Sequence, residues 1–194
     1  MKSIIFDLGG VLFARDPSKV ASEVIEFFSF ITDKKMPEFW EEYDRGTRTL
    51  AQTIEHLCQT KGCSKELCEE YIKITIETQE PIPATEALVR ELKQRGYKLY
   101  VLSNMSRDYI AMLRRHDVYK LFDGEVVSCE QGSVKPEEAI YKILLERFEL
   151  DPAESLFVDD RPENIETARR LGINGYQFVT ARAKECCDEI RALL

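Results

Sequence analysis

A short apolar run near the beginning of the chain predicts a buried strand. Residues 3–6 read Ser-Ile-Ile-Phe, and an acid, Asp7, follows them directly. A run of this length without polar alternation is typical of a strand that is covered on both faces of a parallel sheet. Gly9 and Gly10 come just after the acid, so we expect the strand to end at Asp7.

The next region, residues 15–80, carries apolar residues at helical spacing. They recur three or four positions apart, which is the period of one helix face. Gly62 and Ser64 are a stop signal and an N-cap between two of the helices. No strand pattern occurs between Ala14 and Gln79. We therefore expect an all-helical insertion, with helices over 17–31, 38–44, 49–61 and 64–77.

Strands and helices alternate in the rest of the chain. Strands are predicted over 97–103, 124–129, 155–158 and 175–179, and helices over 84–95, 107–116, 136–148, 162–171 and 184–193. Alternation of this kind predicts a parallel sheet with right-handed crossovers. The expected fold class is α/β, a Rossmann-like sheet with helices on both faces. Residues 1–14 and 81–194 would form the core domain, and 15–80 the helical insertion.

The composition limits the classes of function that the chain can have. The chain has 194 residues, 44% hydrophobic and 32% charged, with a net charge of -8. An acidic surface repels phosphate backbones, so no nucleic-acid partner is expected. No apolar run reaches the roughly 20 residues that a bilayer span needs, and no signal-peptide pattern is seen. We expect a cytoplasmic monomer or dimer whose six cysteines are reduced thiols.

Polar side chains stand at the ends of three predicted strands. They are Asp7, the pair Ser103-Asn104 and the pair Asp159-Asp160, and Lys135 follows a fourth strand. Open α/β sheets bind their ligands outside the carboxyl ends of the strands. Four polar groups in strand register therefore predict a site at this edge.

Each of these groups has a structural interpretation as well as a functional one. Asp7 is either a turn cap or a nucleophile; Gly9 and Gly10 favour the nucleophile, because a backbone close to substrate or metal needs small residues. Asp159 and Asp160 are either a solvated loop pair or, with Asp7, an oxygen-rich site that suits Mg²⁺.

Three further residues fit the functional reading. Asn164, in the first turn of the next helix, could orient the carboxylates. Lys135 at a helix start and the Ser103 hydroxyl could both hold phosphoryl oxygens. The alternatives are an ordinary surface lysine and a strand end whose hydroxyl is satisfied within the protein.

Four short motifs resemble those of the haloacid dehalogenase-like hydrolase superfamily. They read F-D-L-G-G-V from Phe6, V-L-S-N from Val101, V-K-P-E from Val134 and F-V-D-D-R-P-E-N from Phe157. The helical insertion is similar to the small cap of the first cap class. The D-L-G-G-V form resembles the subgroup with α-D-glucose-1-phosphate phosphatase and the phosphatase domain of soluble epoxide hydrolase.

The resemblance implies a Mg²⁺-dependent phosphatase of small phosphorylated metabolites such as sugar phosphates. Asp7 would attack phosphorus and form an aspartyl-phosphate. The metal would be held by Asp7, the Gly9 carbonyl and Asp160, with Asp159 bound directly or through a neighbour. The remaining roles would be charge neutralisation by Ser103 and Lys135, and phosphate contacts from Asn104 and the Gly10 backbone.

The cap would close over the site and select the substrate. Trp40, Tyr43 and Arg45, just before the Gly46 turn, are the candidates for selection. The alternative for all three is ordinary packing within the cap.

The chain departs from the superfamily pattern at Gly9. Most phosphatases of this kind have a second Asp there as general acid, a group worth roughly 10²–10⁴ in rate. Its loss predicts a slow or selective enzyme. A sugar 1-phosphate, whose leaving oxygen needs little protonation, would suffer least, and Tyr43 or His56 of the cap could supply the proton.

Two other functions stay open. A weakly active or non-catalytic domain that binds a phosphorylated ligand or a partner is compatible with Gly9. A haloacid dehalogenase would need no metal and would use an Arg near the nucleophile, for which Arg15 and Arg45 are available.

Overall fold

Five parallel strands form the central sheet of the computed structural model, which describes residues 1–32 and 35–194. Their order across the sheet is β5-β4-β1-β6-β7, which confirms the predicted α/β fold class. The strands are β1 (Ser3–Phe6), β4 (Lys98–Ser103), β5 (Gly124–Val127), β6 (Ser155–Asp159) and β7 (Asn174–Gln177).

The first strand lies at the centre of the sheet. Ser3 pairs with Lys98 on one side and with Ser155 on the other, and all four residues of β1 are buried. Because the strands are parallel, the residues that follow β1, β4, β5 and β6 gather at one edge. The predicted site residues therefore start from neighbouring strands.

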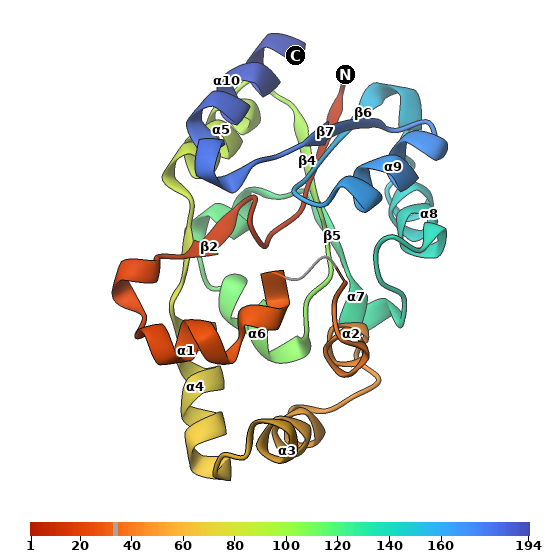
Figure 1. The fold of residues 1–194 in the computed structure, drawn as a ribbon. Coiled ribbons are helices and arrows are strands. Elements are labelled where there is room, and N and C mark those ends of the chain that lie inside the picture. Colours follow the sequence, from red (N-terminus) through yellow and green to blue (C-terminus); the bar gives the residue numbers. More distant parts are fainter. Residues whose placement is uncertain (33–34) are drawn as a thin grey trace.

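Helices cover both faces of the sheet, as predicted (Figure 1). Ile4 and Phe6 of β1 face the core under α5 (Pro83–Gln94) and α10 (Ala183–Leu193). Ile5 points to the opposite face, where the covering helices are α8 (Glu138–Arg147) and α9 (Pro162–Arg170). This alternation follows from the period of two in a strand.

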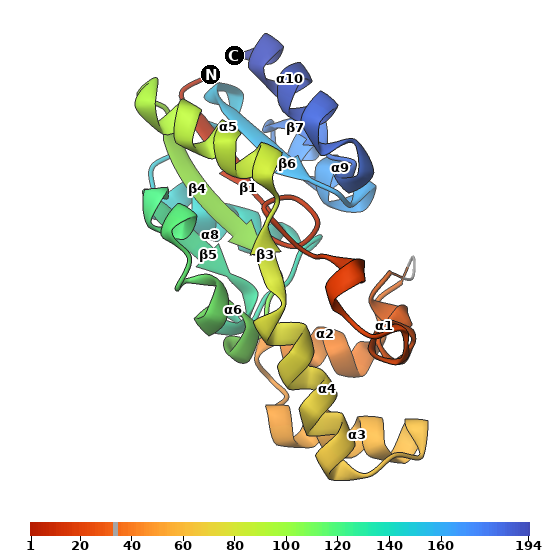
Figure 2. The same ribbon diagram turned by 90° about the vertical axis from the view of Figure 1, so that its left-hand side faces the viewer.

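Four helices of the insertion pack together beyond the carboxyl edge of the sheet (Figures 1 and 2). Their core is rich in aromatic residues, with Phe28, Trp40 and Tyr43 all buried in it. Thr49 forms a capping box with Gln52 at the start of one helix. The helices are α1 (Ser22–Phe27), α2 (Glu38–Arg45), α3 (Leu50–Lys61) and α4 (Lys65–Glu77).

A two-stranded antiparallel ribbon joins the insertion to the core, and the sequence pattern missed it. The strands are β2 (Phe13–Arg15) and β3 (Gln79–Pro81), whereas no strand was expected between Ala14 and Gln79. Three residues are too few to show alternation, and the partners are far apart in sequence. Both predicted boundaries, after residue 14 and after residue 80, fall within this ribbon, and the division into domains stays a prediction.

Two other expectations about local structure were wrong. The helix expected over 17–31 is broken into 3₁₀ turns at 17–19 and 29–32 around α1. The first break comes at Val20 and Ala21, where the backbone is extended, and the second at Phe28, which ends α1. The strand expected over 124–129 ends at Val127, opposite the last residue of β4, and α7 (Ser128–Gln131) follows.

The helix expected over 107–116 is also shorter, as α6 (Arg107–Leu113). Short 3₁₀ turns at 117–121, 152–154 and 180–182 complete the described secondary structure. None of the helices in the two described ranges combines the length and the apolar character that a membrane crossing requires.

Candidate active site

Asp7 is fixed at the carboxyl end of the central strand. Its N–H donates to the Val158 carbonyl at 2.9 Å, which extends the β1–β6 ladder by one residue. The residue is 8% exposed, and its carboxylate Oδ1 lies 2.9 Å from the Lys135 ammonium. Burial raises the pKa of the Asp7 carboxyl; Lys135 opposes this shift and the Asp159 charge adds to it.

Lys135 lies at the centre of the cluster. The residue is 4% exposed, and Nζ donates to Asp159 Oδ2 at 2.6 Å and to the Leu102 carbonyl at 2.9 Å, in addition to the pair with Asp7. Burial lowers the pKa of this ammonium, but the carboxylates of Asp159 and Asp7 together raise it above its ordinary value. Lys135 is therefore not an ordinary surface lysine. It is a buried charged group that contacts two carboxylates.

Asp159 is fully buried, and both of its oxygens accept hydrogen bonds. Oδ1 accepts from the Arg161 N–H at 2.8 Å and from Asn164 Nδ2 at 2.9 Å. Oδ2 accepts from Lys135 and, at 3.0 Å, from the same Asn164 amide. Asn164 thus orients Asp159, and Asp159 in turn holds the lysine. A buried charge with so many donors is well compensated.

Asp7, Asp159 and Asp160 bring carboxylate oxygens within 4.8 Å of one another. Burial raises the pKa of Asp160 to about 7, and repulsion from Asp7 and Asp159 contributes to the shift. A divalent cation would relieve this repulsion, and an all-oxygen donor set is what Mg²⁺ prefers. The residues present therefore fit the magnesium ion that the sequence predicts.

The two glycines after Asp7 differ in their surroundings. Gly10 has a φ of 72°, and a Cβ there would lie 2.9 Å from Asp160 Oδ2. The Thr180 hydroxyl also donates to the Gly10 carbonyl at 2.6 Å. A Cβ at Gly9 would meet no protein atom within 4 Å, and its φ is not in the left-handed region. Contacts within the protein therefore require a glycine only at position 10.

Ser103 and Asn104 end the neighbouring strand in different environments. The Ser103 side-chain oxygen is buried and has no partner of normal hydrogen-bond geometry among the described residues, but the hydroxyl lies near enough to Asp7 to lower the pKa of that carboxyl. The Asn104 amide accepts from the Lys135 N–H at 2.7 Å and donates to the Lys135 carbonyl at 2.9 Å. Asn104 thus fixes the backbone that carries the lysine.

Two of the three predicted selection residues point into the insertion. Trp40 and Tyr43 are both buried in its aromatic core. The Tyr43 hydroxyl donates to Asp108 Oδ2 at 2.8 Å, and burial raises the pKa of this phenol above its ordinary value. His56, the other proposed proton donor, stacks on Phe39 with ring centroids 4.2 Å apart. Both side chains are therefore engaged by groups of the protein.

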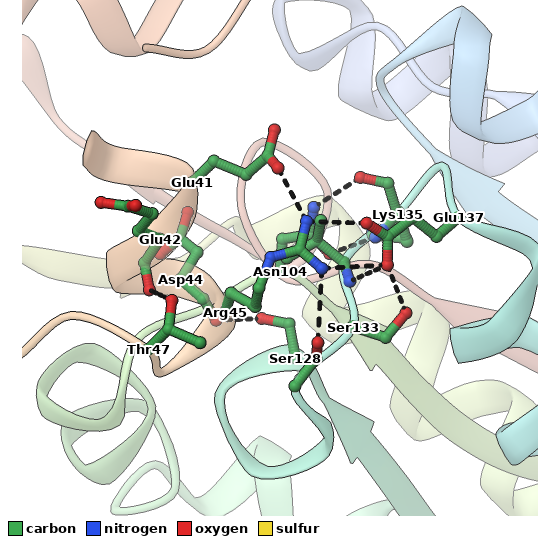
Figure 3. Close-up of polar contacts among 12 residues, drawn as sticks. Glu41, Glu42, Asp44, Arg45, Thr47, Asn104, Ser128, Ser133, Lys135 and Glu137 are labelled. Carbon is green, nitrogen blue, oxygen red and sulfur yellow. Dashed lines mark hydrogen bonds and ion pairs between the residues drawn. The ribbon is translucent and has the colours of Figure 1, made fainter. Parts of the chain in front are cut away.

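Arg45, the third selection residue, bridges the insertion and the core (Figure 3). Its guanidinium donates to the two carboxylate oxygens of Glu137 at 2.7 and 3.0 Å and to Glu41 at 2.8 Å. It also reaches the Gly132 carbonyl at 3.3 Å. The guanidinium is therefore engaged by protein groups, and a role in substrate selection stays a prediction.

The sequence reading missed Asp44, which precedes Arg45 on α2. Burial raises the pKa of this carboxyl to about 7 and Asp7 adds to the shift, while the Ser106 N–H and Arg161 oppose it. Its main-chain carbonyl accepts from the Ser128 hydroxyl at 2.5 Å (Figure 3). The only sequence signal was its place beside the Arg45-Gly46 turn, because the contact joins residues 84 positions apart.

The carboxyl edge of this parallel sheet holds a buried carboxylate, a lysine between two acids and an oxygen-rich cluster. Together these features are typical of one class of α/β hydrolases. A family model for haloacid dehalogenase-like hydrolases matches residues 1–172. The chain belongs to the haloacid dehalogenase-like hydrolases, as the four motifs indicated, and is an enzyme of the hydrolase class.

Similar proteins include two curated phosphatases. The sesquiterpene phosphatase astK of Aspergillus oryzae is 29% identical over 100% of this chain and 96% of its own length. The phosphorylated carbohydrates phosphatase of Thermotoga maritima is 25% identical over 89% of this chain and 82% of its own. Among solved structures, a family enzyme of Bacteroides thetaiotaomicron in a magnesium complex has a TM-score of 0.74 at 24% identity. That match covers 94% of this chain and 95% of the other, and it shows the shared fold.

Proposed function

We propose that the protein is a Mg²⁺-dependent phosphatase of small phosphorylated metabolites, and that Asp7 is its nucleophile. The observation that carries this proposal is the position of the Asp7 carboxylate, 2.9 Å from the Lys135 ammonium and beside the Asp160 carboxylate. A carboxylate with a compensating ammonium and a cation site can accept a phosphoryl group as an aspartyl-phosphate.

The residues around Asp7 would have different roles in the reaction. The metal would be held by Asp7, the Gly9 carbonyl and Asp160, because both oxygens of Asp159 already accept hydrogen bonds. The ion, when bound, offsets the charge between an anionic nucleophile and an anionic phosphate. The buried Ser103 hydroxyl would donate to a phosphoryl oxygen. Lys135 neutralises a second oxygen, and Asn104 keeps that lysine in place.

The substrate class is best addressed with a panel. One similar protein is named for sesquiterpenes and another for phosphorylated carbohydrates. We favour sugar phosphates as substrates, and prenyl monophosphates belong in the same panel. The insertion, which we propose to be a cap over residues 15–80, would make the choice because it lies beyond the edge that carries Asp7.

Release of inorganic phosphate from this panel, with Mg²⁺ or with EDTA, tests the proposal. We expect Mg²⁺-dependent turnover that Asp7→Asn abolishes, and ³²P trapped on the wild-type chain but not on the variant. Chloride release from a chloroacid in EDTA would indicate a dehalogenase instead. Ligand-induced stabilisation without turnover would indicate a binding domain.

A further inference from the structure

Cleavage of a phosphate ester with a poor leaving group needs a proton for the departing oxygen. Asp7, Asp159 and Lys135 are tied to one another, and Asp160 faces the cation site. Gly9 offers no side chain, the Tyr43 hydroxyl donates to Asp108, and His56 stacks on Phe39. A further acid is therefore needed for such substrates.

Asp44 is held against the core by its backbone. The Ser128 hydroxyl donates to its carbonyl at 2.5 Å, and the same hydroxyl accepts from the Met105 N–H at 2.9 Å. Two residues on, Gly46 packs so closely that a Cβ would lie 2.4 Å from the Cys129 carbonyl. The end of α2 is thus fixed on α7, which follows β5, at the edge of the sheet that carries Asp7.

The carboxylate of Asp44 lies close enough to this edge to be influenced by groups there. The Ser106 N–H, three residues beyond Ser103, lowers the pKa of this carboxyl, and the Asp7 charge raises it. The other ionisable groups that act on it or feel its charge are Arg161, Glu41, Tyr109 and Cys129. Asp44 forms no ion pair within the described ranges, so its carboxyl is not committed to a cation.

We propose, on the basis of the proposed function, that Asp44 is the general acid and base of the reaction and is supplied by the insertion. As Asp7 Oδ attacks phosphorus, the bond from phosphorus to the leaving oxygen breaks and the Asp44 proton goes to that oxygen. Asp44 then takes a proton from the water that attacks the aspartyl-phosphate. The products are the alcohol and inorganic phosphate, and both acids return to their starting states.

This arrangement makes the chemistry depend on docking of the insertion. The acid arrives only when α2 rests on Ser128 and Cys129, so a detached insertion would leave the nucleophile without its proton donor. A proton donor supplied by a separate element is one way in which docking of that element can complete the catalytic set.

Single-turnover cleavage of two esters by Asp44→Asn, with Mg²⁺ present, tests the proposal. p-Nitrophenyl phosphate has a leaving group that needs no proton, so its nitrophenol burst should stay within about threefold of wild type. A hexose 6-phosphate needs the proton, and its cleavage should fall by about 10²-fold or more. Aspartyl-phosphate should accumulate on the variant, because the second step loses its base.

Glu42→Gln is the matched control, since Glu42 lies on the same helix and pairs with Arg48 within the insertion. It should leave both esters unchanged. An equal loss for both esters in Asp44→Asn would show a structural role and overturn the inference, as would no loss for either. A wild type that releases no phosphate from any ester would overturn the proposed function, and the inference with it.

Discussion

At the scale of single residues, the site depends on how much space surrounds each backbone position. Gly9 and Gly10 are neighbours of the same type, yet only Gly10 combines a φ of 72° with a close approach to Asp160. Sequence alone could not separate them, because both follow the same strand and both read as turn residues. The difference lies in the path of the backbone.

The two glycines provide a matched pair of variants. Gly10→Ala forces a left-handed backbone on an alanine and pushes its Cβ against Asp160, so it should lower the free energy of unfolding by about 1–2 kcal/mol. Gly9→Ala should change it by less than about 0.5 kcal/mol. Urea denaturation of both metal-free variants measures the difference. Equal destabilisation by the two substitutions would contradict the close approach of Gly10 to Asp160.

At the scale of elements, Arg45 ties the end of α2 to the loop that carries Lys135. Glu137, its main partner, also accepts from Ser133 Oγ at 2.7 Å, and Arg45 contributes most to lowering the pKa of Glu137 to about 2. The pairing is bidentate but partly exposed, which limits its contribution to about 1 kcal/mol. Its effect is therefore expected in docking of α2 more than in global stability.

Arg45→Met should weaken this tie and lower kcat/KM about fivefold for substrates whose leaving oxygen needs a proton, because fewer molecules would have Asp44 in place. Arg48→Met is the control, since Arg48 pairs with Glu42 at 2.7 Å within the insertion and has similar exposure. A substrate panel distinguishes docking from selection. If Arg45→Met changes the ranking among these substrates instead of lowering their rates together, Arg45 contacts the substrate as the sequence predicted.

The sequence predicts elements well where a signal is local. Asp7, Ser103 and Asp159 each follow a recognisable apolar run, and the parallel order of strands brings them to one edge. The β2–β3 ribbon and the contact from Asp44 to Ser128 are different, because each joins distant segments through a few backbone atoms. Neither leaves a periodic pattern in the chain.

At the scale of the whole molecule, the acids that converge on the site should make stability depend on pH. The pKa of Asp44 is raised from 3.8 to about 7, so its folded form binds a proton that the unfolded chain has already lost near neutral pH. Stability is therefore lost as pH rises between these two values. Asp160, whose pKa is also raised to about 7, acts in the same direction.

Asp44→Asn removes one of these two groups and leaves the other. The amide of the variant has no charge to bury, so the variant should gain stability relative to wild type as pH rises from about 4 to 7. A complete shift corresponds to about 4 kcal/mol, and partial exposure of the side chain reduces the expected gain to about 1–3 kcal/mol. Urea denaturation of both proteins in EDTA at pH 5 and pH 8 measures it. The contribution of Asp160 largely cancels in the comparison, so a stability difference that is the same at both pH values would contradict burial of the Asp44 carboxyl.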